Sequence, residues 1–174
     1  WIPKVPSGLS RLFHLASFGA ASFLSAIWHA FRLRPDVVVG IEPTLSAVPS
    51  VLASAALGQS KSWLHVQDFE VAAALALGMV KQGLIGEIAI KVDVWLKRRF
   101  DLLSSISSNM VPRLIETTGN SENVRLFQNW VECEKIYPMA TVPNFRKELG
   151  FGDDDVVALY SGNMGNKQGL SIIA

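Results

Sequence analysis

The stretch Asp36-Val-Val-Val-Gly40 lies directly after Arg34-Pro35, and its aspartate is followed by an uninterrupted apolar run. A run of this kind, without polar alternation, is typical of a strand that is buried on both faces of a parallel sheet. A helix of small residues is predicted over 44–57, after Pro43, and Gly58 is expected to act as its C-cap residue. The stretch therefore predicts a strand–helix unit of an α/β protein.

The same order of strand and helix repeats along the chain. Apolar strands are predicted over 62–67, 101–106 and 123–127, and helices over 71–80, 84–99 and 109–119. A cap is expected at Asn109, with Pro112 tolerated in the first turn of that helix. This repeat predicts an α/β fold built on a doubly wound, mostly parallel sheet.

A long helix is predicted over 9–31, before the first strand. It is mostly apolar, with a thin stripe of serines and histidines that recur every three to five residues. The length would suffice to span a bilayer, but the polar residues argue against a membrane span. Two interpretations stay open, a helix buried against a sheet and a helix that lies on a membrane surface.

Composition excludes several classes of protein. The 174 residues are 49% hydrophobic and 18% charged, so the chain can bury a core and is not intrinsically disordered. The net charge of +1 gives no reason to expect a nucleic-acid partner. A lone cysteine, Cys133, excludes an internal disulfide and a cysteine zinc cluster, and it favours a cytoplasmic location.

The predicted elements divide the chain into two domains and a connection. We expect a partial amino-terminal domain over 1–130, a crossover over 131–155 with a short helix at 144–149, and the start of a second domain over 156–174. The run Val156-Val-Ala-Leu-Tyr160 is predicted to be the first, buried strand of that second domain. The opening Trp1-Ile-Pro-Lys is typical of a mid-chain loop, so a fragment that lacks both ends is expected.

Ligands of open α/β sheets bind beyond the carboxyl ends of the strands, where His65, Asp68 and Glu70 form the densest polar cluster. A carboxylate at Asp68 could accept a proton or bind sugar hydroxyls, or it could simply cap the next helix. For His65, a hydrogen-bonded core histidine is as good an interpretation as a site residue. Glu42 could reach a substrate hydroxyl, although a solvated loop glutamate is the favoured interpretation.

The basic run 97–99 is interpreted as a solvated helix end, with contact to anionic lipid as the alternative. No metal site is predicted. The turn after the last predicted strand combines glycines, the cation of Lys167 and a helix start, which are the parts of a phosphate cradle. The spacing matches no phosphate-binding signature, so a simple strand-to-helix turn is the alternative.

Several of these stretches together resemble a known family. The segments Tyr160-Ser-Gly-Asn-Met-Gly-Asn-Lys-Gln-Gly-Leu170, Leu64-His-Val-Gln-Asp-Phe-Glu-Val71, Ser104-Ser-Ile-Ser-Ser-Asn-Met110 and Phe127-Gln-Asn-Trp130 are similar in order and spacing to GT-B glycosyltransferases of the family 4 type. More narrowly, the chain resembles bacterial exopolysaccharide transferases of the colanic acid type, often described as fucosyltransferases. The resemblance covers nearly the whole chain.

The resemblance implies two Rossmann-like domains, the first binding the acceptor and the second a GDP- or UDP-sugar donor. It implies a retaining transfer to a lipid-linked saccharide at the inner face of the plasma membrane, with no cofactor. Asp68 and His65 would lie near the reacting carbon, and Glu42 and Glu70 on the acceptor side. The donor diphosphate would be held by Gly162, Asn163, Gly165, Lys167, Gln168 and Gly169. Many relatives have arginine where this chain has Asn163.

Two other functions remain open from the sequence. A sugar-nucleotide epimerase shares the two-domain architecture but needs no acceptor. A membrane-associated binding domain without catalytic activity would also account for the apolar helix over 9–31 and the basic run 97–99.

Overall fold

The computed structural model describes residues 8–42, 45–76, 78, 83–138, 145–152, 154–162 and 169–172. The chain forms two units, Trp1–Gln128 and Asn129–Ala174, and each is described here by itself. The domain boundaries inferred from the sequence stay a prediction.

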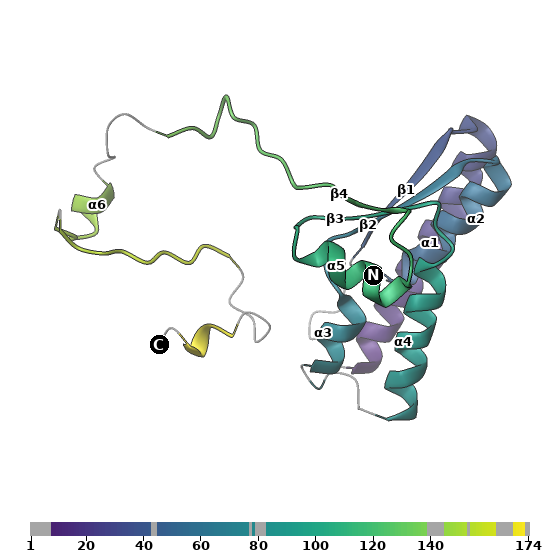
Figure 1. Cartoon of the computed structure of the whole chain (residues 1–174), viewed down its shortest axis with the longest axis horizontal. Coiled ribbons are helices and arrows are strands. Elements are labelled where there is room, and N and C mark those ends of the chain that lie inside the picture. The colour runs from purple at the N-terminus through teal and green to yellow at the C-terminus, as the bar shows by residue number, and fades with distance from the viewer. Residues whose placement is uncertain are drawn as a thin grey trace. The chain divides into compact units, whose positions relative to one another are not determined.

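The first unit is built on a four-stranded sheet. Its strands are β1 (Val37–Glu42), β2 (Lys61–Val66), β3 (Leu102–Ser105) and β4 (Val124–Leu126). They are all parallel and lie in the order β1-β2-β3-β4 (Figure 1). Each of the four strands predicted for this unit is present, and the expected α/β, Rossmann-like parallel sheet is confirmed.

Helices connect the strands in the predicted alternation. They are α1 (Gly8–Leu33), the 3₁₀ turn η1 (Leu45–Ala47), α2 (Val48–Gly58), α3 (Glu70–Ala76), α4 (Leu84–Lys97) and α5 (Met110–Thr118). Because the strands are in sequential order and parallel crossovers are right-handed, the connecting helices fall on the same face of the sheet. We call this the covered face.

The core lies between the covered face and the helices. Leu64 and Val66 of β2 and Leu103 of β3 contribute to it from the sheet, and all three are buried. The remaining buried members of the cluster are Val48 from α2, Leu96 from α4, Phe100, Leu114 from α5 and Val124. Burial of these apolar side chains is the main stabilising contribution to the unit.

The opposite side of the sheet, which we call the open face, carries Val37, Val39 and Ile41 of β1, all about half exposed. The same face carries Trp63 and His65 of β2, because side chains alternate along a strand. A doubly wound sheet would have helices here as well, and the described residues supply no second helical layer.

The helix ends differ in part from the predictions. Gly58 is the last residue of α2, and Gln59 takes the left-handed C-cap conformation at φ 55°. The predicted cap role of Gly58 is therefore wrong. A Cβ atom added at Gly58 would stand 2.8 Å from Oγ of Ser60 and 3.9 Å from the side chain of Ala30 on α1. At the end of α5, Gly119 takes the left-handed C-cap position, as predicted.

The long helix α1 packs against α2 and against the turn η1, which it approaches most closely at Gly19. A Cβ atom added at Gly19 would stand 2.9 Å from the carbonyl oxygen of Ser46, so only glycine permits this approach. In the described part of the chain, neither α1 nor any other helix combines the length and hydropathy that crossing a membrane requires.

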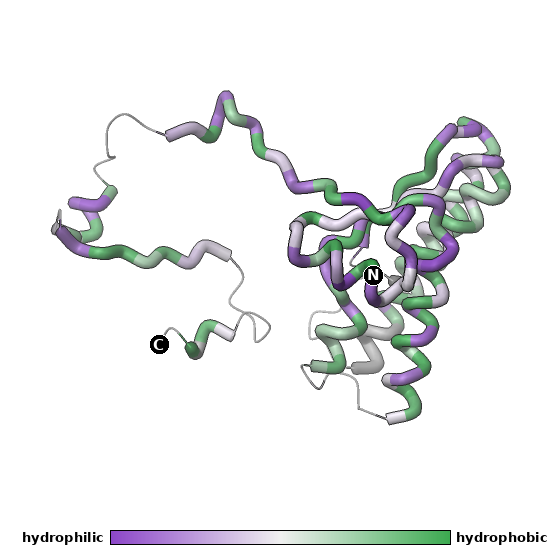
Figure 2. The backbone as a smooth tube through the Cα atoms, viewed as in Figure 1, coloured by the Kyte–Doolittle hydropathy of each residue, from purple (hydrophilic) through white to green (hydrophobic). Residues whose placement is uncertain are grey.

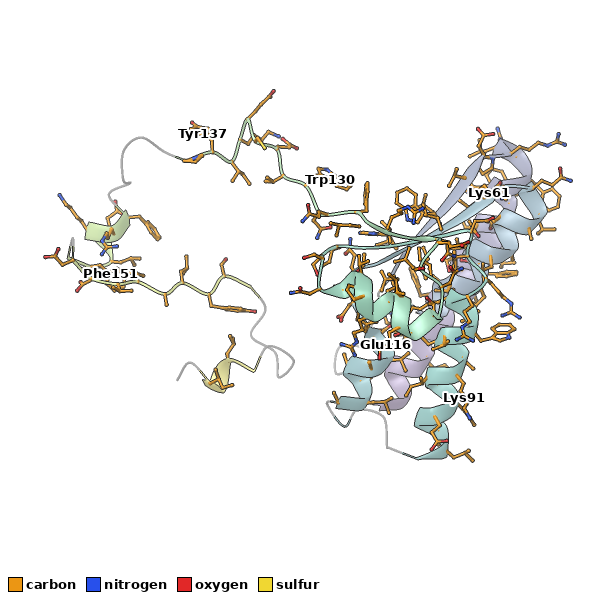
Figure 3. The ribbon with its side chains drawn as sticks, in the orientation of Figure 1. Lys61, Lys91, Glu116, Trp130, Tyr137 and Phe151 are labelled. Atoms are coloured by element: carbon orange, nitrogen blue, oxygen red, sulfur yellow. The ribbon has the colours of Figure 1, made fainter. Side chains whose placement is uncertain are left out.

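In its described residues, the second unit contains α6 (Phe145–Glu148) and the 3₁₀ turn η3 (Leu170–Ile172). The strand predicted at 156–160 is wrong for this structure, since that run is extended, with Val156 98% and Leu159 86% exposed. The run is hydrophobic, as Figure 2 shows, but the described part of this unit offers no neighbouring strand to pair with its backbone. Trp130 and Tyr137 project from the extended stretch before α6 (Figure 3).

Candidate functional site

The carboxyl ends of the first two strands meet at one edge of the sheet. Glu42, the last residue of β1, is in register with Val66, the last residue of β2. The turn that follows β2 carries Asp68, and α3 begins at Glu70. The fold therefore brings Glu42, Asp68 and Glu70 to the same edge, as the strand order predicts.

Glu42 belongs to a buried group of charges on the covered face. Its Oε1 atom lies 3.2 Å from Nζ of Lys97, and the same Nζ donates a hydrogen bond of 2.8 Å to Oδ2 of Asp93. The side chains of Glu42 and Lys97 are each 1% exposed. We call Glu42, Asp93 and Lys97 the charged triad. The prediction of a solvated loop glutamate at Glu42 is wrong, because β1 continues to Glu42 and the side chain of Glu42 is buried.

Two carboxylates share one ammonium group in the charged triad, so their negative charge is not fully compensated. Among the described residues, Oε2 of Glu42 and Oδ1 of Asp93 are buried with no hydrogen-bond partner. Burial raises the pKa of Glu42 to about 7, against the opposing effect of Lys97, and the charge of Asp93 raises it further. Glu42 therefore gains or loses its proton near neutral pH.

An aromatic side chain, Phe69, lies beside the charged triad. The ring of Phe69 lies 5.7 Å from Nζ of Lys97 and 4.6 Å from the guanidinium carbon of Arg113 on α5. Glu70 acts on the triad through its charge, which contributes to the raised pKa of Glu42. Phe69 thus lies beside two cations, as the quadrupole of an aromatic ring favours.

His65 lies on the open face, on the other side of the sheet from Glu42. Its Nδ1 atom is 2.8 Å from Oγ of Ser104, its registered partner on β3. The ring meets the edge of Phe127 at a centroid distance of 5.5 Å. Burial lowers the pKa of His65, so the neutral imidazole is favoured. The interpretation of His65 as a hydrogen-bonded, largely buried histidine is confirmed, and its catalytic role stays a prediction.

Asp68 lies in the turn between β2 and α3 and is half-buried. The residue directly before α3 is Phe69, whose carbonyl oxygen accepts a hydrogen bond from the amide of Ala73. Asp68 and Glu70 are therefore close to the sheet edge, and their roles toward a ligand stay predictions.

The predicted phosphate cradle falls mostly outside the described residues, which exclude Asn163, Gly165, Lys167 and Gln168. Gly162 is described, and a Cβ atom added there would stand 3.1 Å from the hydroxyl oxygen of Tyr160. Gly169 has a φ of 60°, a left-handed conformation that favours glycine. The donor site stays a prediction.

The sequence alone did not indicate the contacts that Asp93, Lys97 and Ser104 make at this part of the sheet. Asp93 and Lys97 are four residues apart on α4, and this spacing predicts an ion pair on one helix face. Ser104 gave no comparable signal, because its partners come from another strand. The interpretation of residues 97–99 as a solvated helix end is wrong for Lys97 and right for Arg98 and Arg99, which are exposed.

The described residues include no group of three or more histidine, cysteine, aspartate or glutamate side chains that could hold a metal ion. The charged triad has two carboxylates, but Lys97 already occupies the space between them. This edge of the sheet offers carboxylates, an imidazole and aromatic rings, which are groups that bind and orient hydroxyl-rich ligands.

Comparison with known proteins finds one informative similarity. The chain is 37% identical over 175 aligned residues to a protein of Escherichia coli K12 that is described as a provisionally assigned colanic acid biosynthesis glycosyl transferase, WcaI. The alignment covers 98% of this chain and 43% of that relative, so the chain spans less than half the relative's length. No protein-family model and no solved structure matches the chain. The resemblance to glycosyltransferases of the colanic acid type is thus confirmed.

Proposed function

We propose that this chain is part of a glycosyltransferase that transfers a sugar from a nucleotide-sugar donor to a saccharide acceptor in exopolysaccharide biosynthesis. The observation that carries the proposal is the 37% identity that extends over 98% of the chain. The Rossmann-like sheet supports it, because its carboxyl edge is the usual place for a ligand in such folds.

On this proposal the first unit binds the acceptor. Asp68 and Glu70 lie at the carboxyl edge, where carboxylates can accept hydrogen bonds from sugar hydroxyls. Asp68 is the candidate for the group nearest the reacting carbon, together with His65. Glu42 is buried in the charged triad, so it would act through the position of this edge and not by touching the acceptor.

The donor is proposed to be a GDP- or UDP-sugar, and no cofactor or metal ion is assigned to the reaction. Gly162, Gly169 and the residues between them would approach its diphosphate, with Lys167 as the cation. Charge that develops on the leaving nucleoside diphosphate would be stabilised by Lys167 and by backbone N–H groups. The transfer is proposed to retain the anomeric configuration of the sugar.

The acceptor is proposed to be lipid-linked, at the inner face of the plasma membrane. Four large apolar side chains of α1, Phe13, Leu24, Trp28 and Phe31, recur on one side of the helix, and each is more than half exposed. The sequence of α1 contains no acidic residue, and the guanidinium carbon of Arg32 lies 5.2 Å from the ring centre of Trp28. An exposed apolar stripe beside cations fits the surface of an anionic bilayer.

Transfer activity tests the proposal directly. The intact protein, supplied with labelled GDP- and UDP-sugars and a lipid-linked saccharide extract, should move label into the lipid fraction. Asp68→Asn and Lys167→Ala should each lower this transfer by about a hundredfold or more, since each removes a group placed at the reacting atoms. Asp154→Asn and Lys147→Ala, at exposed positions, serve as matched controls. Full activity of both site variants would contradict the assignment of the site.

Product analysis without an acceptor separates transfer from epimerisation. A glycosyltransferase should leave the configuration of the nucleotide sugar unchanged under these conditions, whereas an epimerase would produce a second nucleotide sugar. Detection of that second sugar would overturn the proposed transfer reaction.

Membrane contact is tested by flotation with vesicles that contain or lack an anionic lipid. Leu24→Gln with Phe31→Gln should reduce binding to anionic vesicles, while Phe145→Gln, an exposed phenylalanine of α6, should not. The substitution of Lys97 is unsuitable here, because Lys97 holds the charged triad together. Equal binding of all variants would rule out α1 as the contact surface.

A further inference from the structure

We propose that Trp63 and Ser104 are positioning residues that hold His65 in one neutral tautomer, with its Nε2–H group directed to a substrate oxygen. This inference rests on the proposed function for the identity of the substrate. The tautomer itself can be tested without any activity.

A chain of hydrogen bonds joins three side chains on the open face. The indole Nε1–H group of Trp63 donates to Oγ of Ser104 at 2.7 Å. The same Oγ atom lies 2.8 Å from Nδ1 of His65. Ser104 is the centre of this chain, which joins two residues of β2 through one residue of β3. We call Trp63, Ser104 and His65 the imidazole relay.

The directions of these hydrogen bonds follow from the chemistry of each group. An indole nitrogen only donates, so the Ser104 oxygen accepts from Trp63. Ser104 is 0% exposed, so its own hydroxyl hydrogen needs an acceptor inside the protein. The acceptor within reach among the described residues is Nδ1 of His65. Nδ1 is therefore unprotonated, and the proton of the neutral ring lies on Nε2.

The other ring nitrogen of His65, Nε2, is not fully buried. Nε2 makes no hydrogen bond to the described residues, and it is not among the buried polar atoms that lack a partner. Nε2 is thus reached by solvent, at a position one residue before the carboxyl end of β2. An N–H group with a fixed direction at this edge is suited to donate to a sugar hydroxyl or a phosphate oxygen.

The ring of Phe127 packs against the rings of both Trp63 and His65. Its ring meets Trp63 at a centroid distance of 5.2 Å and an interplanar angle of 81°, and it meets His65 at 5.5 Å and 90°. Edge-to-face contacts of this kind are favoured over a direct face-to-face sandwich. The orientation of the imidazole is therefore restrained by a hydrogen bond on one side and by an aromatic ring on the other.

Long-range ¹H–¹⁵N spectra of the imidazole test the tautomer. The wild-type protein should show a protonated Nε2 and an unprotonated Nδ1. Ser104→Ala should populate both tautomers, because the ring loses the hydroxyl donor at Nδ1. Trp63→Phe keeps the aromatic ring and removes the N–H donor, so it provides a second variant should Ser104→Ala fail to fold.

Ser105→Ala is the matched control. Ser105 is also 0% exposed, and its hydroxyl donates a hydrogen bond of 2.8 Å to the carbonyl oxygen of Val66. Its removal should leave the tautomer of His65 unchanged. An unchanged tautomer in both Ser104→Ala and Trp63→Phe would overturn the proposal.

Kinetics test the positioning role in the intact protein. Ser104→Ala should lower kcat by about three- to tenfold, the effect of one lost hydrogen bond, and should do so more than Ser105→Ala. Equal kinetics of the two serine variants would overturn the positioning role. If the wild-type protein transfers no sugar at all, the proposed function fails, and the spectra still decide the tautomer.

Discussion

The two faces of the sheet stabilise their buried polar groups in different ways. On the covered face, the charged triad places two carboxylates around one ammonium and leaves two oxygen atoms without a hydrogen bond among the described residues. On the open face, the imidazole relay is neutral, and the Trp63 indole, the Ser104 hydroxyl and Nδ1 of His65 are joined by hydrogen bonds. Buried charge is costly without full compensation, whereas a satisfied neutral chain is not. The triad should therefore dominate the response to mutation and to pH.

The largest effect is expected from Lys97→Met. This change leaves Glu42 and Asp93 buried without their cation, and the free energy of unfolding at pH 8 should fall by about 3–5 kcal/mol. Lys91→Met on the exposed side of α4 is the control, with an expected effect within about 0.5 kcal/mol (Figure 3). Urea denaturation measures both. Similar losses of unfolding free energy in the two variants would show that Lys97 does not compensate the buried carboxylates of Glu42 and Asp93.

The second effect is a dependence on pH that belongs to Glu42. Its pKa is about 7 in the folded protein and near 4.5 when the side chain is exposed, so between these values the folded state holds a proton that the unfolded state has released. The free energy of unfolding should therefore fall as pH rises from about 4.5 to 7, by at most about 1.4 kcal/mol per pH unit. Glu42→Gln should remove this slope, and Glu87→Gln, at an exposed position of α4, should keep it. If the free energy of unfolding of Glu42→Gln still falls between pH 4.5 and 7, the titrating group is not Glu42.

The third test compares the same substitution on the two faces. Val66→Ala removes a fully buried side chain from the core and should cost about 2 kcal/mol. Val39→Ala, on the open face of the neighbouring strand, should cost less than about 1 kcal/mol, because Val39 is half exposed. Thermal unfolding of the two variants gives the comparison. An equal loss at Val39 would mean that the open face is packed in solution.

The smallest effect is expected at Asp101, where β3 begins. The backbone amide of Ser62 donates to its Oδ2 atom, Lys61 donates to Oδ1, and the hydroxyl of Ser62 also donates to Oδ2, so the pKa of Asp101 is lowered to about 2. This stabilisation is present above pH 3.8 and is lost as pH falls toward 2. Since the side chain is 41% exposed, Asp101→Asn should lower stability at pH 6 by no more than about 1 kcal/mol. Equal acid-unfolding midpoints in the wild type and the variant would contradict this assignment.

Much of the fold could be predicted from the sequence because it depends on local patterns. The strands that became β1 to β4 are marked by apolar runs, and the helices by their periodic spacing. The prediction was wrong at 156–160, where an apolar run has no neighbouring strand in the described part of its unit. A strand needs hydrogen-bond partners that its own sequence does not contain.

The candidate site was predicted in its position and only partly in its chemistry. Strand ends placed Glu42, His65, Asp68 and Glu70 at one edge of the sheet, as the parallel order requires. The sequence did not predict that Glu42 is buried, since its burial depends on Lys97 of a helix more than fifty residues away. It also did not predict that Ser104 meets His65, because that contact depends on the register between two strands.

The sequence by itself determined the order of elements, the parallel sheet and the resemblance to glycosyltransferases, since each of these follows from patterns along the chain. The tertiary structure alone decided which charges are buried together and which ring nitrogen of His65 carries the proton. Burial and hydrogen-bond partners are properties of neighbours in space, and they set the pKa of Glu42 and the tautomer of His65.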